Sequence, residues 1–380
     1  MQELELQLRT RAIFGPGAVD RLGEMAREMG FRHTLLVTDH GLVEAGHFEH
    51  AAGRLRAAGI EVTGYHDFHE NPDTRNVEAG RDFAASQQID SIVGLGGGSS
   101  MDCAKGVNFL LTQGGRMQDY WGYGKAAQPM LPMIGIPTTT GTGSEAQSYA
   151  LIADAETHKK MACGDPKASF RLAILDPLLA VSQPAAVRAA AGYDAISHAV
   201  ETWATTRRNP ASEAFSRRAW ERVEKNYERV LDSPDNVEST GAMMLGAFFA
   251  GAAIEHSMLG ATHACANPLT ARYGTVHGVA IALLLSHVVR WNAPVCSSRY
   301  AELAQIAGLD ADATHAAGAL AQRLEQLAAR AGLQTRLGAA GVPREDLPAL
   351  AEDAGGQWTG RFNPRPFDAA AAREVYECAY

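Results

Sequence analysis

The sequence is poor in cysteine and in positive charge. Its five cysteines are widely scattered among 380 residues and form no CxxC pair, so we expect neither a disulfide framework nor a cysteine–zinc cage. A reducing cytoplasm is therefore the expected compartment. Lys and Arg number 34 against 43 Asp and Glu, a net charge of −9, and such a surface makes nucleic acid an unlikely partner.

Long apolar runs are also missing. The two most apolar stretches, 241–254 and 279–289, fall short of the roughly 20 residues that cross a bilayer, so no membrane partner is expected. The start of the chain is acidic and alternating, which is not the pattern of a signal peptide. With 46% hydrophobic residues, the chain has enough apolar side chains to fill the cores of two domains.

The first half alternates short β-branched runs with helical patterns, which indicates βαβ units and a parallel sheet. Strands are expected at 34–38, 61–65, 91–95, 133–136 and 173–175, with helices at 40–58 and 76–87.

The second half has apolar residues spaced by three and four, which predicts an all-helical domain. Helices are expected at 185–205, 210–230, 239–257, 279–291, 313–331 and 368–376. The change of pattern near residues 182–184 predicts an α/β domain over 1–183 and a helical domain over 184–380.

A glycine-rich loop follows the strand expected at 91–95. Its glycines allow a close backbone approach to a ligand, and the N–H groups of the following helix favour an anion. An ordinary tight turn between strand and helix explains the same residues equally well. The candidates for cofactor binding here are Gly96, Gly97, Gly98, Ser99, Ser100 and Asp102.

A second loop, rich in hydroxyls and glycines, follows the strand expected at 133–136. Two such loops at the carboxyl ends of strands suit a pyrophosphate and a ribose. Asp39, after an earlier strand, is placed to accept hydrogen bonds from the adenosine ribose, and its charge would repel a 2′-phosphate, favouring NAD over NADP. A helix N-cap is the equal alternative for Asp39. The candidates in the second loop are Thr138, Thr139, Thr142 and Ser144.

Asp194 and His198 are spaced i, i+4, so on a helix they share one face. Taken alone, such a pair is usually a hydrogen bond on a helix surface. Two more histidines follow: His263 is expected to end an apolar helix, with Pro268 interrupting the chain, and His277 to open the next helix. One carboxylate and three imidazoles form a donor set suited to Fe²⁺ or Zn²⁺.

Taken together, these segments resemble the iron-containing (group III) alcohol dehydrogenases almost from end to end. Each segment is weak evidence alone, and the combination is specific. The matching segments are 14–17, 35–39, 71–72, 96–102 with Lys105, 137–145, 192–201 and 363–366.

The resemblance implies a nucleotide-binding α/β domain, an all-helical metal domain of the dehydroquinate-synthase-like type, and a cleft between them. It implies metal ligation and catalysis by Asp194, His198, His263 and His277, and NAD(P) binding by Asp39 and the two loops. Lys160 is a candidate cation near the cofactor or an anionic substrate, or else a solvated surface lysine. The candidates for the substrate pocket are Asn71, Tyr149, Leu151, Ile254 and Asn267.

Asn267 is a departure from the family pattern, which usually has a histidine there that faces the pocket without binding the metal. Thr270 and Val276 also stand where the family often has glycine and proline. Asparagine cannot shuttle a proton but can donate and accept hydrogen bonds. We expect the change to affect substrate orientation or proton exit and to leave metal binding intact, unless it is neutral drift.

The implied reaction is hydride transfer between NAD(H) and a small alcohol or aldehyde whose oxygen is polarised by the metal. A dehydroquinate-synthase-like lyase, with no net redox change, is the alternative within this fold. A metal-independent reductase of related sequence and a non-catalytic binding module are the other two. A homodimer is expected, since dimers are the commonest oligomers.

Overall fold

The computed structural model describes residues 7–312 and 314–380, and these residues divide into two compact units. The acidic start of the chain at 1–6 and residue 313 lie outside the described residues. One unit holds 143–182 and the described residues up to 139, and the other holds 140–142 and 183–380.

The first unit is built on a six-stranded parallel sheet with the order β1-β9-β6-β4-β2-β3, which confirms the predicted fold class for this half. Its strands are β1 (Arg11–Phe14), β2 (His33–Val37), β3 (Glu61–Tyr65), β4 (Ser91–Gly96), β6 (Met133–Pro137) and β9 (Leu172–Leu175). Its α-helices are α1 (Leu22–Glu28), α2 (His40–Glu44), α3 (His47–Ala57), α4 (Thr74–Ala85), α5 (Gly98–Gln113) and α6 (Pro177–Ala180).

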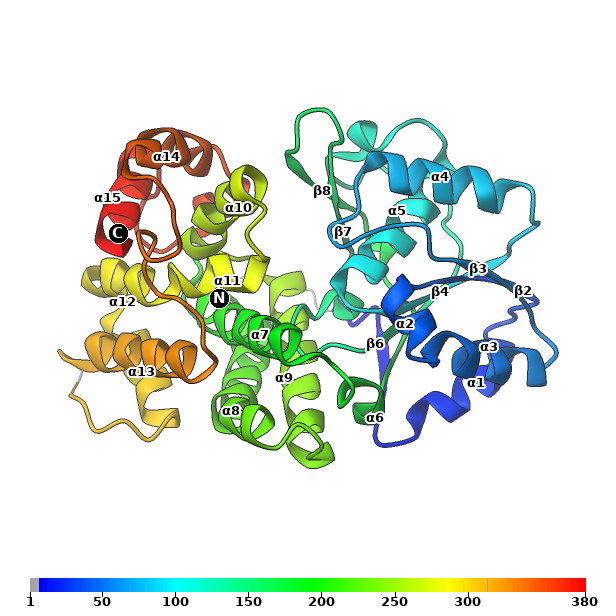
Figure 1. Ribbon diagram of the computed structural model, residues 1–380, viewed down its shortest axis with the longest axis horizontal. Coiled ribbons are helices and arrows are strands. Elements are labelled where there is room, and N and C mark those ends of the chain that lie inside the picture. Colours follow the sequence, from blue (N-terminus) through cyan, green and yellow to red (C-terminus); the bar gives the residue numbers. More distant parts are fainter. Residues whose placement is uncertain (1–6, 313) are drawn as a thin grey trace. The chain divides into compact units, whose positions relative to one another are not determined.

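Apolar side chains cover both faces of this sheet, as parallel strands require. Leu35 and Ile92 pack with α4 and α5 on one face, whereas Leu36 and Val93 pack with α1 and α3 on the other. Figure 1 shows these two pairs of helices on opposite sides of the sheet. The inner strands β4 and β6 are accordingly buried along their whole length, whereas the edge strands β1 and β3 are partly exposed.

A second, three-stranded sheet in the same unit was not predicted. It has the order β5-β8-β7, from β5 (Gly122–Tyr123), β7 (Tyr149–Ala153) and β8 (Lys160–Gly164). β7 and β8 are antiparallel, and their Ala- and Gly-containing sequences carry little β-branched signal. β7 contacts α5, so tertiary packing stabilises this sheet.

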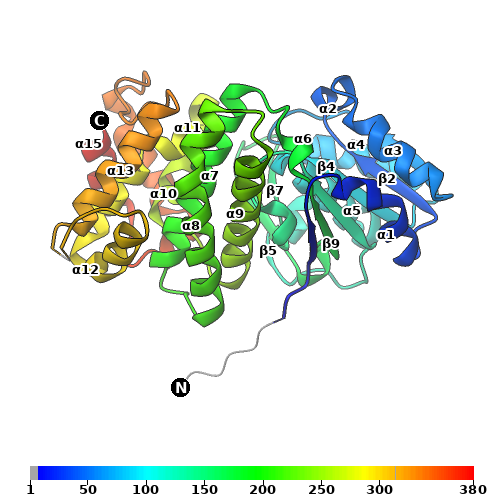
Figure 2. The same cartoon turned by 90° about the horizontal axis from the view of Figure 1, so that it is seen from below.

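The second unit is helical, as predicted. Figure 2 shows α7, α8 and α9 side by side within it, and their pairwise contacts bury Tyr193, Trp220 and Tyr227 completely. Its helices are α7 (Ala185–Ala204), α8 (Pro210–Asp232), α9 (Val237–His256), α10 (Ala261–Tyr273), α11 (His277–Ala282), α12 (Leu285–Ile306), α13 (Ala316–Arg330), α14 (Leu347–Gly355) and α15 (Ala369–Ala379).

Three local expectations were wrong. The helix expected over 40–58 is two helices separated at Gly46, whose φ of 81° is left-handed. The helix expected over 279–291 is divided between α11 and α12. His263 does not end an apolar helix: α9 ends at His256, and α10 runs through Pro268. Packing of α10 against α11 and α14 offsets the backbone hydrogen bond that proline removes.

Helix α9 is long and apolar enough to cross a membrane by length and composition alone. However, 72% of its most apolar window is buried inside the protein, as in a core helix. The five cysteines are free thiols, and four of them are buried.

Candidate functional site

Helix α7 places Asp194 and His198 on one face, one turn apart, as their spacing predicts. Both side chains are buried, with exposed fractions of 4% and 5%. Nε2 of His198 lies 3.3 Å from Oδ1 of Asp194. The two groups therefore interact directly within an otherwise apolar wall.

Two further histidines come from α10 and α11. His263 lies in the first turn of α10, and His277 opens α11 as predicted. Gly278 allows α11 to approach α7 closely, because a Cβ atom there would lie 2.1 Å from the backbone oxygen of Ala190. A side chain at position 278 would push His277 away from Asp194.

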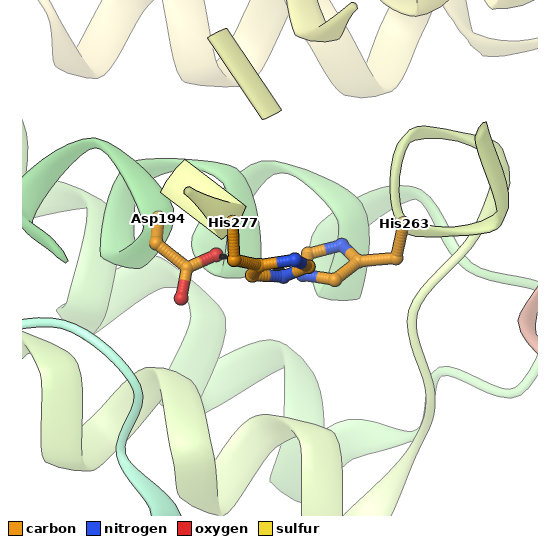
Figure 3. A group of neighbouring side chains, drawn as sticks. All are labelled: Asp194, His263 and His277. Carbon is orange, nitrogen blue, oxygen red and sulfur yellow. Dashed lines mark ion pairs between the residues drawn. The ribbon is translucent and has the colours of Figure 1, made fainter. Parts of the chain in front are cut away.

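The three imidazoles converge on one oxygen of Asp194. Nε2 of His198 lies 3.3 Å from Oδ1 of Asp194. Nε2 of His263 and Nε2 of His277 lie 3.6 and 3.8 Å from the same oxygen. Ligand atoms of Asp194, His263 and His277 all lie within 4.8 Å of one another, and Figure 3 shows these three side chains. The imidazole rings of His198 and His263 stack with their centroids 5.0 Å apart.

The charges around this point are strongly coupled. Burial alone would raise the pKa of the Asp194 carboxyl, but the nearby histidine rings outweigh burial and hold that pKa well below its usual range. Burial lowers the pKa of His198. For His263 the carboxylates of Glu201 and Asp194 outweigh burial and raise the pKa to about 9. The site thus keeps an ionised carboxylate next to imidazole nitrogens.

These residues fit a divalent metal such as Fe²⁺ or Zn²⁺. Ligands about 2.1 Å from a tetrahedral ion lie about 3.4 Å apart, close to the 3.3 to 3.8 Å that separate the three imidazole nitrogens from Oδ1 of Asp194. Among the described residues, buried Oδ1 of Asp194 and buried Nε2 of His263 have no hydrogen-bond partner. Such atoms are costly to bury unless another group satisfies them.

Glu201 is the neighbour that the sequence analysis overlooked. It closes the matching segment 192–201 and lies seven residues after Asp194 and three after His198, hence on the same helix face. This spacing was the available signal. Its carboxylate contacts Nδ1 of His263 and is 5% exposed.

The predicted cofactor residues of the other unit follow three adjacent strands. β6, β4 and β2 are neighbours in the sheet, so the segments after them meet at its carboxyl edge. The chain leaves β2 toward β3 on one side and leaves β4 toward β6 on the other, so a topological switch point, where open α/β sheets bind ligands, lies between β2 and β4.

The glycine loop opens α5 without a side-chain cap at its N-cap residue, Gly97. The loop is tightly packed: a Cβ atom at Gly96 would lie 2.3 Å from Oγ of Ser100, and one at Gly97 would lie 3.2 Å from Cγ2 of Thr139. Gly98 and Ser99 form the first turn of the helix. Its backbone N–H groups suit a phosphate.

Asp39 caps α2, because its Oδ1 accepts from the backbone N–H of Leu42 at 3.2 Å. Its other oxygen accepts from the hydroxyl of Ser100 at 3.3 Å. Asp39 therefore acts as the helix N-cap that was one of its two expected roles. Its second oxygen connects α2 to the glycine loop.

Asn71 joins two other predicted residues. Its backbone N–H donates to Oγ of Ser99 at 3.1 Å, and its side-chain oxygen accepts from Nζ of Lys160 at 3.4 Å. Asn71 has a left-handed φ of 56° and an exposed side chain.

Asp102 and Ser144 connect the two loops. Oγ of Ser144 donates to Oδ1 of Asp102 at 2.8 Å, and fully buried Lys105 donates to the same hydroxyl at 2.9 Å. Burial raises the pKa of the Asp102 carboxyl, although Lys105 and Lys160 oppose the shift. These contacts give both residues a structural role in holding the loops together.

The remaining predicted residues fall in both units. Thr138, Thr139, Tyr149 and Leu151 belong to the sheet unit, whereas Thr142, Ile254 and Asn267 belong to the helical unit. Tyr149 and Leu151 are half-buried on β7, and Ile254 is buried on α9. Asn267 is half-buried on α10, where its amide donates to Oε1 of Gln357 at 3.1 Å.

Comparison with protein families gives two matches that cover most of the chain. Residues 9–177 match the model for the iron-containing alcohol dehydrogenases, and residues 188–380 match the C-terminal model of the Fe-containing alcohol dehydrogenase family.

Individual proteins agree with these matches. The chain is 34% identical to alcohol dehydrogenase 4 of Schizosaccharomyces pombe, covering 93% of this chain and 83% of that protein. It is 31% identical to an NAD-dependent methanol dehydrogenase of Bacillus methanolicus, covering 93% and 94%. The crystal structure of a 1,3-propanediol oxidoreductase superposes with a TM-score of 0.96 at 31% identity, covering all of both chains.

Proposed function

The chain belongs to the iron-containing alcohol dehydrogenase family and is an oxidoreductase acting on CH–OH groups, and on this premise we propose that it transfers a hydride between NAD(H) and a small alcohol or aldehyde. The convergence of Asp194, His198, His263 and His277 carries the proposal, because these residues would hold the catalytic metal. Family membership implies a metal and a nicotinamide dinucleotide. Fe²⁺ is the metal we propose, and the same donors also accept Zn²⁺.

When bound, the metal would polarise the substrate oxygen, and the nicotinamide would exchange a hydride with the substrate carbon. The protein would hold the metal in place and supply negative charge next to it. Asp194 contributes a full negative charge to the donor set, and apolar α7 residues such as Ala195 hold it in a dry wall. His277 is 24% exposed, whereas His198 and His263 are each 6% exposed in their side chains. Access to the donor set is therefore on the His277 side.

NAD is the dinucleotide we propose. Each oxygen of the Asp39 carboxylate can accept a further hydrogen bond, which suits ribose hydroxyls, and its charge would repel a 2′-phosphate. The glycine loop at the start of α5 would hold the pyrophosphate, with Thr138, Thr139 and Ser144 beside it. The NAD-dependent methanol dehydrogenase among the similar proteins supports the choice. That protein and the 1,3-propanediol oxidoreductase also support a small alcohol as substrate.

The metal prediction is tested with protein reconstituted separately with Fe²⁺ and Zn²⁺. We expect about one ion per chain, alcohol-dependent NADH formation, and loss of activity on chelation. His263→Ala should lose both bound metal and activity, whereas His287→Ala, which removes a buried histidine that contacts the Thr335 carbonyl, should keep both. Full turnover without metal would favour a metal-independent reductase, and no net NADH from any alcohol would favour the lyase alternative.

The choice of dinucleotide is tested by Asp39→Asn. Asparagine keeps the N-cap of α2 and removes the charge. We expect kcat/KM for NADP relative to NAD to rise by roughly tenfold, which corresponds to about 1.4 kcal/mol. Asp82→Asn, at an exposed position in the same unit, is the control. An unchanged ratio would mean that Asp39 does not face the ribose.

The role of Asn267 is tested by Asn267→His. This residue lies four positions after His263 and so on the same face of α10. We propose that it affects substrate orientation or proton exit, and we expect the histidine variant to change the pH–rate profile and the ranking of alcohols at unchanged metal content. The same profile and ranking in both proteins would contradict this role.

A homodimer is the proposed solution state. In the described sheet β1 is an edge strand, and Phe14 and the preceding Leu8 are 46% and 64% exposed. Such edges are templates for pairing with another chain. Light scattering should give about twice the chain mass of 40.5 kDa; a monomer mass would contradict the proposal.

The free thiols support a cytoplasmic location, which cell fractionation would test.

A further inference from the structure

Glu201 accepts from two different donors at the start of α10. Its Oε1 accepts from the backbone N–H of Thr262 at 2.7 Å, and its Oε2 contacts Nδ1 of His263. All three groups are buried. One carboxylate therefore contacts both the helix that carries His263 and the ring of His263 itself.

The chemistry of these contacts determines which ring nitrogen carries hydrogen. An ionised carboxylate can only accept hydrogen bonds, so Nδ1 of His263 must be the donor. In the neutral ring that would bind a metal, Nε2 is then the nitrogen that offers a lone pair, and it is Nε2 that lies 3.6 Å from Oδ1 of Asp194. A carboxylate that accepts from the ring nitrogen not bound to the metal commonly fixes the tautomer of a metal-binding histidine.

The start of α10 is built around this carboxylate. Its N-cap residue, Gly260, has no side chain to satisfy the first N–H groups. Asn363 accepts from the N–H of Ala261 at 3.2 Å, and Glu201 accepts from the N–H of Thr262. A Cβ atom at Gly260 would lie 3.0 Å from Oδ1 of Asn363 and 3.2 Å from Oε1 of Glu201. Glycine thus lets both oxygens approach the helix end.

Asn363 is itself held firmly. Its amide donates to Oδ1 of Asn292 and to the Arg365 carbonyl, both at 2.8 Å, and its oxygen accepts from the amide of Asn292 at 3.1 Å. The cavity beside Glu201, Asn292 and Asn363 has a volume of only about 10 Å³. Little empty space therefore adjoins Glu201 on this side.

We propose that Glu201 is a positioning residue that holds His263 with hydrogen on Nδ1 and Nε2 directed at the metal, and that Asn363 supports it by fixing the start of α10. The inference rests on the proposed function, because it assumes that His263 binds a metal. In the Asn-Pro-Arg-Pro segment at 363–366, which contributes none of the proposed ligands, Asn363 would then help to position one of them.

Glu201→Gln is the sharpest variant because it keeps the shape of the side chain. An amide has one accepting oxygen, so either the Thr262 N–H or Nδ1 of His263 loses its acceptor. If the amide nitrogen faces the ring, it donates to Nδ1, and the ring hydrogen moves to Nε2, where it blocks the metal. A role limited to capping α10 would reduce stability without changing the tautomer.

The experiment measures Zn²⁺ affinity of the full-length protein by competition with a chelator. We expect Glu201→Gln to bind Zn²⁺ about 10- to 100-fold more weakly than the unaltered protein. Glu224→Gln is the matched control, since Glu224 is a buried carboxylate of the same unit that pairs with Arg323 on α13. The control should be destabilised while keeping its Zn²⁺ affinity within about twofold.

A second measurement does not depend on any variant. Nitrogen-15 NMR of the histidines in the unaltered Zn²⁺-loaded protein should show His263 coordinated through Nε2, with a hydrogen-bonded hydrogen on Nδ1. Coordination through Nδ1, or equal Zn²⁺ affinity for Glu201→Gln and the unaltered protein, would overturn the positioning role of Glu201 and leave the proposed function intact. If the unaltered protein binds neither Zn²⁺ nor Fe²⁺, the proposed function itself fails, and the inference with it.

Discussion

The structure of the helical unit depends on bringing three imidazoles to one carboxylate oxygen. Asp194 and His198 are neighbours on α7, but His263 and His277 reach Oδ1 of Asp194 only because α10 and α11 begin at the right places. An ionised carboxylate is expensive to bury without compensating charge. The histidines, and a divalent ion when present, supply that charge, so stability and chemistry share the same contacts.

Close backbone approach makes this convergence possible. Gly278 removes the Cβ atom that would strike Ala190, and Gly260 removes the one that would crowd Glu201 and Asn363. Large buried side chains then hold the helices: Trp220 donates to the Leu303 carbonyl at 2.9 Å, and Tyr227 donates to the Ala189 carbonyl at 2.6 Å. A tightly packed core of this kind keeps ligands in place better than a loop would.

The sheet unit organises its polar groups by a different device. Parallel strands align their carboxyl ends, so residues far apart in the chain meet at one edge without needing helices to converge. Asp39 contacts Ser100, and Asp102 contacts Ser144, across 61 and 42 residues of sequence. Lys105, buried below them, donates to the Ser144 and Tyr149 carbonyls at 2.8 and 2.7 Å, which ties the second loop to β7.

The sequence by itself determined the two-part fold class, most helices and the parallel strands, because periodicity and β-branched runs are local signals. It also determined the shared face of Asp194 and His198, since their spacing fixes it on any helix.

Tertiary structure decided the rest. Packing against α11 and α14 keeps α10 helical through Pro268, and contact with α5 stabilises β7 and β8 despite their weak strand signal. The partnership of Glu201 with His263 and of Asn363 with Ala261 joins residues 62 and 102 positions apart. No local pattern encodes such a contact, because it exists only once the helices have packed.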